Sequence, residues 1–198
     1  MDHYFTNNEE LKSDESIFEA ELLGRKFKFT TDRGVFSKDG VDFGSRLLIE
    51  NFQIPDVAGD LLDVGCGYGV MGLSLAHLCS KRLVHMVDVN LRALDLTSRN
   101  ALANKLENVK IYESFCYDNV QERFAAIVSN PPIRAGKKVV HQILEEAPRK
   151  LAPGGQLWIV IQKKQGAESA RKKMAEVFGN CELVVKKKGF QILVSKVY

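Results

Sequence analysis

Short apolar runs alternate with segments of helical periodicity from residue 60 onward, and this alternation constrains the fold more than any other feature of the sequence. The apolar runs LLDV, RLVHMVDV, VKIYES, FAAIVSN and GGQLWIVIQ have the length and composition of buried strands. Apolar residues recur at helical spacing in the intervening segments VMGLSLAHLC, LRALDLTSRNALANK and HQILEEAPRKL. Strands that alternate with helices form an open, mostly parallel sheet with helices on both faces. The sequence therefore predicts an α/β fold.

The last two apolar runs, CELVVK and FQILVSKV, are joined only by Lys187, Lys188 and Gly189. A parallel connection needs about a dozen residues, so these two strands must run antiparallel. Together with the five earlier runs they predict a Rossmann-like, seven-stranded sheet that is mostly parallel and ends in an antiparallel C-terminal hairpin.

Three helices carry more specific expectations. Pro148 is expected to interrupt or end the helix over 141–151, because proline lacks the backbone N–H group. The buried face of the helix over 91–105 is expected to consist of Leu91, Leu94, Ser98, Ala101 and Leu102. That of the helix over 167–178 is expected to consist of Ala167, Ala170, Met174, Val177 and Phe178.

The N-terminal part of the chain has a different pattern. Residues 1–16 are polar and are expected to lie at the periphery, and the alternating apolar residues that follow predict two short strands about Gly24. The segment VDFGSRLLIENF predicts a helix, since its apolar residues Phe43, Leu47, Leu48 and Phe52 recur at helical spacing. No repeat or linker interrupts the chain, so we expect residues 1–55 to be an appendage packed on a core of residues 56–198, in a single domain overall.

Composition excludes several classes of protein. Hydrophobic residues make up 45% of the 198 residues and charged residues 27%, which is typical of a globular protein rather than a disordered one. No apolar run approaches the roughly 20 residues of a membrane span, and the N-terminus lacks the pattern of a signal peptide, so we expect a cytoplasmic protein without a membrane partner. The cysteines form no CxxC pair and the histidines no HExxH motif, so no metal site is expected.

Charge is distributed unevenly along the chain. Residues 134–198 contain 14 basic and 5 acidic residues, whereas residues 1–133 contain 14 basic and 20 acidic residues. A basic C-terminal third is compatible with a polyanionic partner, although a run of charges is also typical of an ordinary solvated surface.

A glycine-rich turn, LDVGCGYG, follows the first strand of the alternating region. Its residues Gly65, Gly67 and Gly69 permit positive φ and let the backbone approach a ligand closely. Asp88 ends the next strand, where a carboxylate can accept hydrogen bonds from ribose hydroxyls. The glycines alone also fit a tight structural turn, and Asp88 alone fits a helix cap. Together they predict a site for an adenosine-containing ligand.

The segment SNPPI directly follows the fourth of these strands. Ligands of parallel sheets bind outside the carboxyl ends of the strands, so this segment should face the glycine turn. Pro131 and Pro132 stiffen the backbone after Asn130, and two neighbouring carbonyl acceptors there suit a planar NH₂ group. A loop ended by prolines is the alternative interpretation of this segment.

These motifs resemble those of the class I S-adenosylmethionine-dependent methyltransferases. LDVGCGYG is similar to their first motif, VDVN to their second, and NPPI to the fourth motif of members that methylate amino groups. HYF, GVFS, DFGSRLLIE and NPPIRAGK further resemble segments of the small-subunit (16S) ribosomal RNA guanine-N2 methyltransferases. The resemblance covers nearly the whole chain and implies S-adenosyl-L-methionine as cofactor. It implies as substrate the ribosomal RNA or the small ribosomal subunit, and as reaction the methylation of guanine N2.

The resemblance also implies roles for individual residues. Asn130 and Pro131 are the expected catalytic residues. The expected cofactor-binding residues are Asp63, Gly65, Cys66, Gly67, Asp88, Val89, Ser114, Phe115 and Asn130, and the expected substrate-binding residues are Pro132, Ile133, Arg134 and Lys137.

The sequence departs from the family pattern at two positions. Ser114 stands where many members have an acidic residue at the adenine, and Ile133 stands where many have an aromatic residue that stacks on the target base. Methylation of a protein glutamine or of a DNA adenine is an alternative activity, since both also present a planar NH₂ group; Ile133 argues against the glutamine, because the enzymes that methylate it typically have a tyrosine there. A non-enzymatic RNA-binding module and a nicotinamide oxidoreductase are the alternatives from other classes.

Overall fold

The computed structural model describes residues 12–38 and 40–198. Its main sheet consists of β3 (Leu61–Val64), β4 (Val84–Asp88), β5 (Val109–Glu113), β6 (Phe124–Ser129), β7 (Leu151–Gln162), β8 (Glu182–Lys187) and β9 (Phe190–Lys196). The strands lie in the order β5-β4-β3-β6-β7-β9-β8. Strands β3 to β7 are parallel, and β9 runs antiparallel to both β7 and β8. The predicted sheet and its C-terminal hairpin are confirmed.

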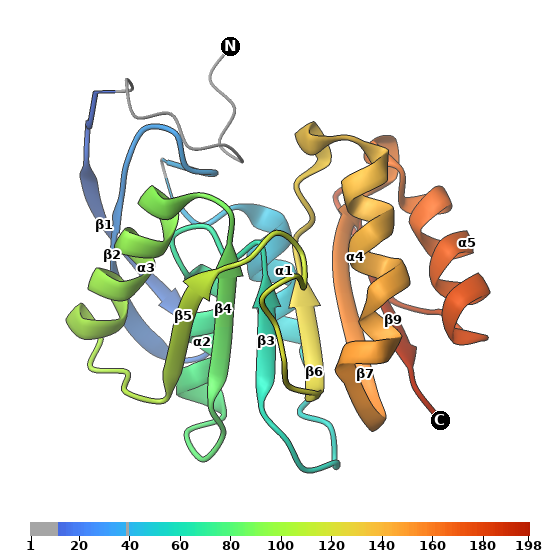
Figure 1. The fold of residues 1–198 in the computed structure, drawn as a ribbon. Helices are drawn as coiled ribbons and strands as arrows, with labels where there is room; N and C mark the ends of the chain where they lie inside the picture. The colour runs from blue at the N-terminus through green and yellow to red at the C-terminus, as the bar shows by residue number, and fades with distance from the viewer. Residues whose placement is uncertain (1–11, 39) are drawn as a thin grey trace.

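Helices cover both faces of this sheet (Figure 1). The elements packed on one face are α1 (Phe43–Asn51), α2 (Val70–Leu78), α3 (Leu91–Ala103) and a ribbon of two antiparallel strands, β1 (Ser16–Leu22) and β2 (Arg25–Thr31). The elements on the other face are α4 (Lys137–Lys150) and α5 (Ala167–Phe178). Pro148 lies inside α4, where its nitrogen cannot donate to the Leu144 carbonyl, and the helix ends two residues later, at Lys150.

The two faces of the sheet form two separate hydrophobic cores. Leu157 and Ile159 of β7 contribute to the core under α4 and α5, while Trp158 and Val160 contribute to the core under α1, α2 and α3. Side chains of a strand alternate between faces, so continuous apolar runs are the expected pattern for strands covered on both sides.

The buried face of α5 begins as predicted. Ala167, Ala170 and Met174 are buried, whereas Val177 and Phe178 are half-buried near the end of the helix.

The predicted buried face of α3 is wrong at both of its ends and at Ser98, which is exposed. Leu91 and Leu102 are 53% and 79% exposed. The residues that α3 buries are Ala93, Leu94, Leu96, Thr97, Asn100 and Ala101. Because this face includes polar side chains, apolar periodicity assigned it incorrectly.

Two asparagines explain why α3 buries polar groups. Asn100 accepts a hydrogen bond from the N–H group of Thr30 at 2.7 Å and donates one to the Thr30 carbonyl at 2.9 Å. Asn104, just after the helix, makes the same pair of bonds with Lys28 at 3.0 and 2.8 Å. These amides pair with backbone N–H and C=O groups on the edge of β2, which would otherwise lack hydrogen-bond partners.

The N-terminal segment shares the core of the main sheet. Phe27 and Phe29 of β2 belong to the same apolar cluster as Leu61 and Trp158. The loop between β2 and α1 is thereby carried to the edge of the sheet where β3, β4 and β6 end. Within the part of the chain that the structure describes, no helix is long and apolar enough to cross a membrane.

Candidate functional site

A cavity of about 940 Å³ lies at the carboxyl ends of β3, β4 and β6. The chain leaves β3 for β4 on one side and reaches β6 and β7 on the other, so the strand order reverses here. Ligands of open α/β sheets bind at such reversals.

The glycine turn after β3 forms one wall of this cavity. Gly65 and Gly67 have φ values of 75° and 57°, which other residues rarely adopt. A Cβ atom added to either glycine would meet no heavy atom within 4 Å, so the space in front of both is open. The turn is held to β4 because the N–H groups of Gly65 and Cys66 both donate to the Val87 carbonyl, at 2.9 and 3.0 Å.

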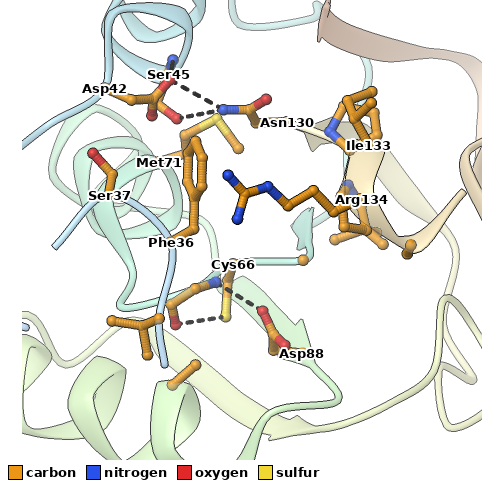
Figure 2. Close-up of a pocket in the computed structure, with 18 of the residues that line it drawn as sticks. Phe36, Ser37, Asp42, Ser45, Cys66, Met71, Asp88, Asn130, Ile133 and Arg134 are labelled. Carbon is orange, nitrogen blue, oxygen red and sulfur yellow. Dashed lines mark hydrogen bonds between the residues drawn. The ribbon is translucent and has the colours of Figure 1, made fainter. Parts of the chain in front are cut away.

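Asp88 stands beside this turn at the end of β4 (Figure 2). Its carboxylate accepts hydrogen bonds from the N–H groups of Gly67 and Asn90, both at 2.9 Å. Burial raises the pKa of this carboxyl above its ordinary value despite these bonds. The helix cap, considered above as an alternative role for Asp88, belongs instead to Asn90, whose side chain accepts from the N–H groups of Arg92 and Ala93.

Asp63 does not reach the cavity. Its side chain is fully buried beneath the glycine turn, where one carboxylate oxygen accepts from the Gly72 N–H group at 2.8 Å. The other oxygen has no hydrogen-bond partner among the described residues. Burial raises the pKa of Asp63 to about 7. The sequence predicts that Asp63 binds the cofactor. From its buried position, the side chain could act on a cofactor only through neighbouring residues.

The remaining predicted cofactor residues line the cavity. Phe115 is 43% exposed and presents an aromatic ring. The hydroxyl of Ser114 is committed to its own loop, since it donates to the Cys116 carbonyl and accepts from the Asn119 N–H group, both at 3.1 Å. Burial raises the pKa of the Cys66 thiol, which fits a small packing residue rather than a nucleophile. Val89 completes this wall.

Asn130 forms the opposite wall, at the end of β6. Its amide nitrogen donates to the carboxylate of Asp42 at 3.2 Å and to the Ser45 hydroxyl at 3.1 Å (Figure 2). Asp42 accepts only and also caps α1 by accepting from the Ser45 N–H group at 3.1 Å. Both amide hydrogens of Asn130 are therefore engaged on one side, which fixes the amide orientation and leaves its oxygen as the group available to a ligand.

The rest of the NPPI segment lies beside Asn130. Pro131, Pro132 and Ile133 line the cavity, and so does Arg134, which follows the segment. The Arg134 side chain extends across the cavity toward Phe36 (Figure 2). Lys137 is exposed at the start of α4 and is not among the lining residues.

Sequence reasoning missed the lining residues between β2 and α1. This loop contributes Val35, Phe36, Ser37, Lys38 and Asp42, and Ser45 follows in α1. Phe36 is 41% exposed and its ring borders the space in front of Asn130 (Figure 2). The segments GVFS and DFGSRLLIE, which carried part of the family resemblance, were the only available signal for them.

Residues 12–38 and 40–198 contain no group of three or more His, Cys, Asp or Glu side chains that could hold a metal ion. The polar groups that line the cavity include Asp88, the backbone of the glycine turn, Asn130 and Arg134.

Comparisons with known proteins relate this chain to methyltransferases. The family model described as the methyltransferase small domain matches residues 26–194. The uncharacterized protein YbxB of Bacillus subtilis strain 168 is 52% identical over 197 residues, which cover 98% of each chain. A ribosomal RNA small subunit methyltransferase C of Actinobacillus pleuropneumoniae is 33% identical over 82% of this chain and 50% of its own length.

One solved structure extends the comparison to bound ligands. A 16S rRNA N2 methyltransferase from T. thermophilus, solved in complex with AdoMet and guanosine, superposes with a TM-score of 0.83 at 26% identity. The match covers 93% of this chain and 51% of that one. This chain thus spans about half the length of these two rRNA methyltransferase relatives.

Proposed function

Since the chain belongs to the methyltransferase small domain family and its cofactor is S-adenosylmethionine, we propose that it methylates the exocyclic N2 amine of a guanine in 16S ribosomal RNA. The observation that carries this proposal is the fixed amide of Asn130, whose oxygen remains available to accept a hydrogen bond from an amine. Asn130 follows β6, the strand beside β3 and its glycine turn.

The residues around the glycine turn fit the cofactor. The open space in front of Gly65 and Gly67 admits a ligand against the backbone, and Asp88 offers carboxylate oxygens to the hydroxyls of a ribose. Phe115 provides an aromatic surface for the adenine, whose polar edge is met by backbone groups of the loop after β5, because the Ser114 hydroxyl is already engaged. When bound, the cofactor supplies a methyl group on a sulfonium centre, whose departure needs no general acid.

Asn130 positions the target amine. Its side-chain oxygen and the carbonyl of Pro131 accept the two hydrogens of the NH₂ group and so orient the nitrogen toward the methyl donor. The hydrogen bond from Asn130 to the Asp42 carboxylate increases the electron density on the amide oxygen, which then stabilises the positive charge that develops on the nitrogen. The methylated nitrogen releases one of its two hydrogens as a proton to water, which leaves a neutral secondary amine. Asp42 and Ser45 act through Asn130 and are positioning residues.

Two further features support a nucleobase as the substrate. Phe36 presents a ring at the space in front of Asn130, so it can supply the stacking surface that Ile133 lacks. The rRNA methyltransferase relatives cover most of this chain at about one-third identity, and the superposed T. thermophilus enzyme was solved with guanosine. A base in RNA reaches such a cavity only when it is unpaired or flipped out.

The test is methyl transfer from isotope-labelled S-adenosylmethionine to 16S rRNA, small ribosomal subunits, DNA and protein in parallel. We expect label in the rRNA or the subunits, and N2-methylguanosine after nuclease digestion. Asn130→Ala should abolish transfer while leaving the affinity for S-adenosylhomocysteine within a few-fold. Label in DNA adenine or protein glutamine alone would reject the RNA assignment, and full activity of Asn130→Ala would reject the mechanism.

A further inference from the structure

The turn between β8 and β9 lies at the same edge of the sheet as the cavity. Because β9 runs antiparallel to β7, its first residue Phe190 pairs with Gln162, the last residue of β7. The N–H group of Lys163 donates to the Gly189 carbonyl at 2.8 Å. A segment distant in sequence from NPPI is therefore placed two strands away from it, since the order is β6-β7-β9.

This turn is packed firmly against α1. The ring of Phe190 lines the cavity and lies 5.5 Å from the ring of Phe43, between centroids. Gly44 permits this approach, because a Cβ atom there would fall 2.8 Å from the Phe190 ring. The ammonium group of Lys188 lies 5.1 Å from the centroid of Phe43. The turn is thus held by the helix whose cap, Asp42, orients Asn130.

A group of exposed lysines gathers at this edge. We call them the β7–β9 lysines: Lys163, Lys164, Lys186, Lys187 and Lys188. No ion pair joins any of them to a carboxylate among residues 12–38 and 40–198. The sequence from residue 183 to the end contains neither Asp nor Glu.

The lysines of α5 differ in this respect. Lys172 pairs with Glu168 at 3.6 Å, and Lys173 pairs with Glu145 and Glu176 at 2.9 and 3.0 Å. Of these two groups of lysines, the β7–β9 lysines alone have no ion-pair partner among the described residues. Their positive potential is therefore not cancelled locally.

The position of these lysines fits a strand of nucleic acid that leaves the cavity. Asn130 at the end of β6 separates the glycine turn from the β7–β9 lysines. Neighbouring strands lie about 4.8 Å apart, so β9 begins roughly 10 Å from β6. A nucleotide bound at Asn130 would place the phosphates on one side of it over this edge, within reach of flexible lysine side chains.

We propose that the β7–β9 lysines bind the phosphates of the RNA strand adjacent to the target nucleotide. The proposal rests on the proposed function, because it takes RNA as the substrate and Asn130 as the site of the target base. Beyond the proposed function, it specifies the side of the cavity along which the RNA strand runs.

The test compares two triple variants that remove the same charge. K163Q/K164Q/K187Q neutralises the edge and spares Lys188, which contacts Phe43. R171Q/K172Q/K81Q is the control, since Arg171 and Lys172 lie on the exposed side of α5 and Lys81 precedes β4 at the opposite edge of the sheet. Binding of a fluorescein-labelled transcript of 16S rRNA is followed by anisotropy from 50 to 300 mM salt, and S-adenosylhomocysteine binding verifies an intact fold.

We expect the edge variant to weaken RNA binding at least about tenfold at low salt, with the control within about twofold. The slope of log affinity against log salt should fall by about 0.7 for each lost phosphate contact, or roughly 2 in total. Equal binding by the two triple variants overturns the proposal. If the edge variant loses RNA binding but the wild type methylates no RNA, the proposed function fails while the RNA-binding surface stands.

Discussion

The contribution of Asp63 to the stability of this protein should decrease as the pH rises toward neutrality. Its carboxyl is fully buried, has one hydrogen-bond donor in Gly72, and has a pKa raised to about 7 from the ordinary 3.8. Between these two pH values the folded chain holds a proton that the unfolded chain has released. Protonation therefore favours the folded state below pH 7, and this contribution is lost as the pH rises through the folded pKa.

The size of the effect follows from the two pKa values. Each pKa unit corresponds to about 1.36 kcal/mol, so the shift makes the contribution of Asp63 to the free energy of unfolding about 2.5 kcal/mol larger at pH 5 than at pH 8. Asp63→Asn removes the titration while keeping the shape of the side chain. Any cost of burying the new amide is independent of pH and does not alter this difference.

Urea unfolding of wild type and Asp63→Asn at pH 5, 6, 7 and 8 measures the effect. The free energy of unfolding of the wild type, minus that of the variant, should fall by about 2.5 kcal/mol across this range, mainly below pH 7. Histidine titrations contribute equally to both proteins and cancel. A difference that is the same at pH 5 and pH 8 would show that Asp63 ionises normally and would refute the reasoning.

Three further predictions concern the cavity. Asp88→Ala should weaken S-adenosylhomocysteine binding, measured by calorimetry, by on the order of 10- to 100-fold, because charge-assisted hydrogen bonds are lost. Because the pKa of Asp88 is raised, the affinity of the wild type should also fall on acidification, at a higher pH than for an ordinary carboxyl. An unchanged affinity in the variant would exclude a ribose contact. Asp42→Asn keeps an acceptor and a helix cap but removes the charge behind Asn130, so kcat should fall about tenfold with KM within twofold; a rise in KM alone would contradict that role. Phe36→Leu should raise KM for RNA roughly tenfold, since stacking on a base is worth about 1–3 kcal/mol, whereas Phe36→Trp should keep it low; equal KM values for the two variants would exclude stacking.

The sequence predicted the parts of the site that follow directly from strand ends. Gly65, Asp88 and Asn130 are far apart in the chain, yet the carboxyl ends of parallel strands meet at one edge, so their convergence could be inferred from the alternation of strands and helices alone. The antiparallel hairpin was equally predictable, because a short connection permits no other geometry.

The loop between β2 and α1 could not be placed in this way. It has no periodicity, and its position depends on contacts with distant residues. Asn90 donates to the Gly34 carbonyl at 2.8 Å, and the Tyr68 hydroxyl donates to the Gly40 carbonyl at 3.0 Å. Tertiary contacts such as these bring Phe36 and Asp42 to the cavity. Asp63 illustrates the converse, since its place in the glycine motif did not reveal that its side chain is buried and does not line the cavity.

The paired asparagines of α3 have a consequence for the precision of this arrangement. Asn100 and Asn104 are four helical residues apart, a rise of about 6.0 Å, and their partners Thr30 and Lys28 are two strand residues apart, about 6.6 Å. The two spacings are nearly equal, so both asparagines can pair with β2 at the same time. A slip of β2 by one residue would break both amide pairs at once. The two amide pairs thereby fix the position of β2 along α3, and with it the point from which the loop bearing Phe36 extends over the cavity.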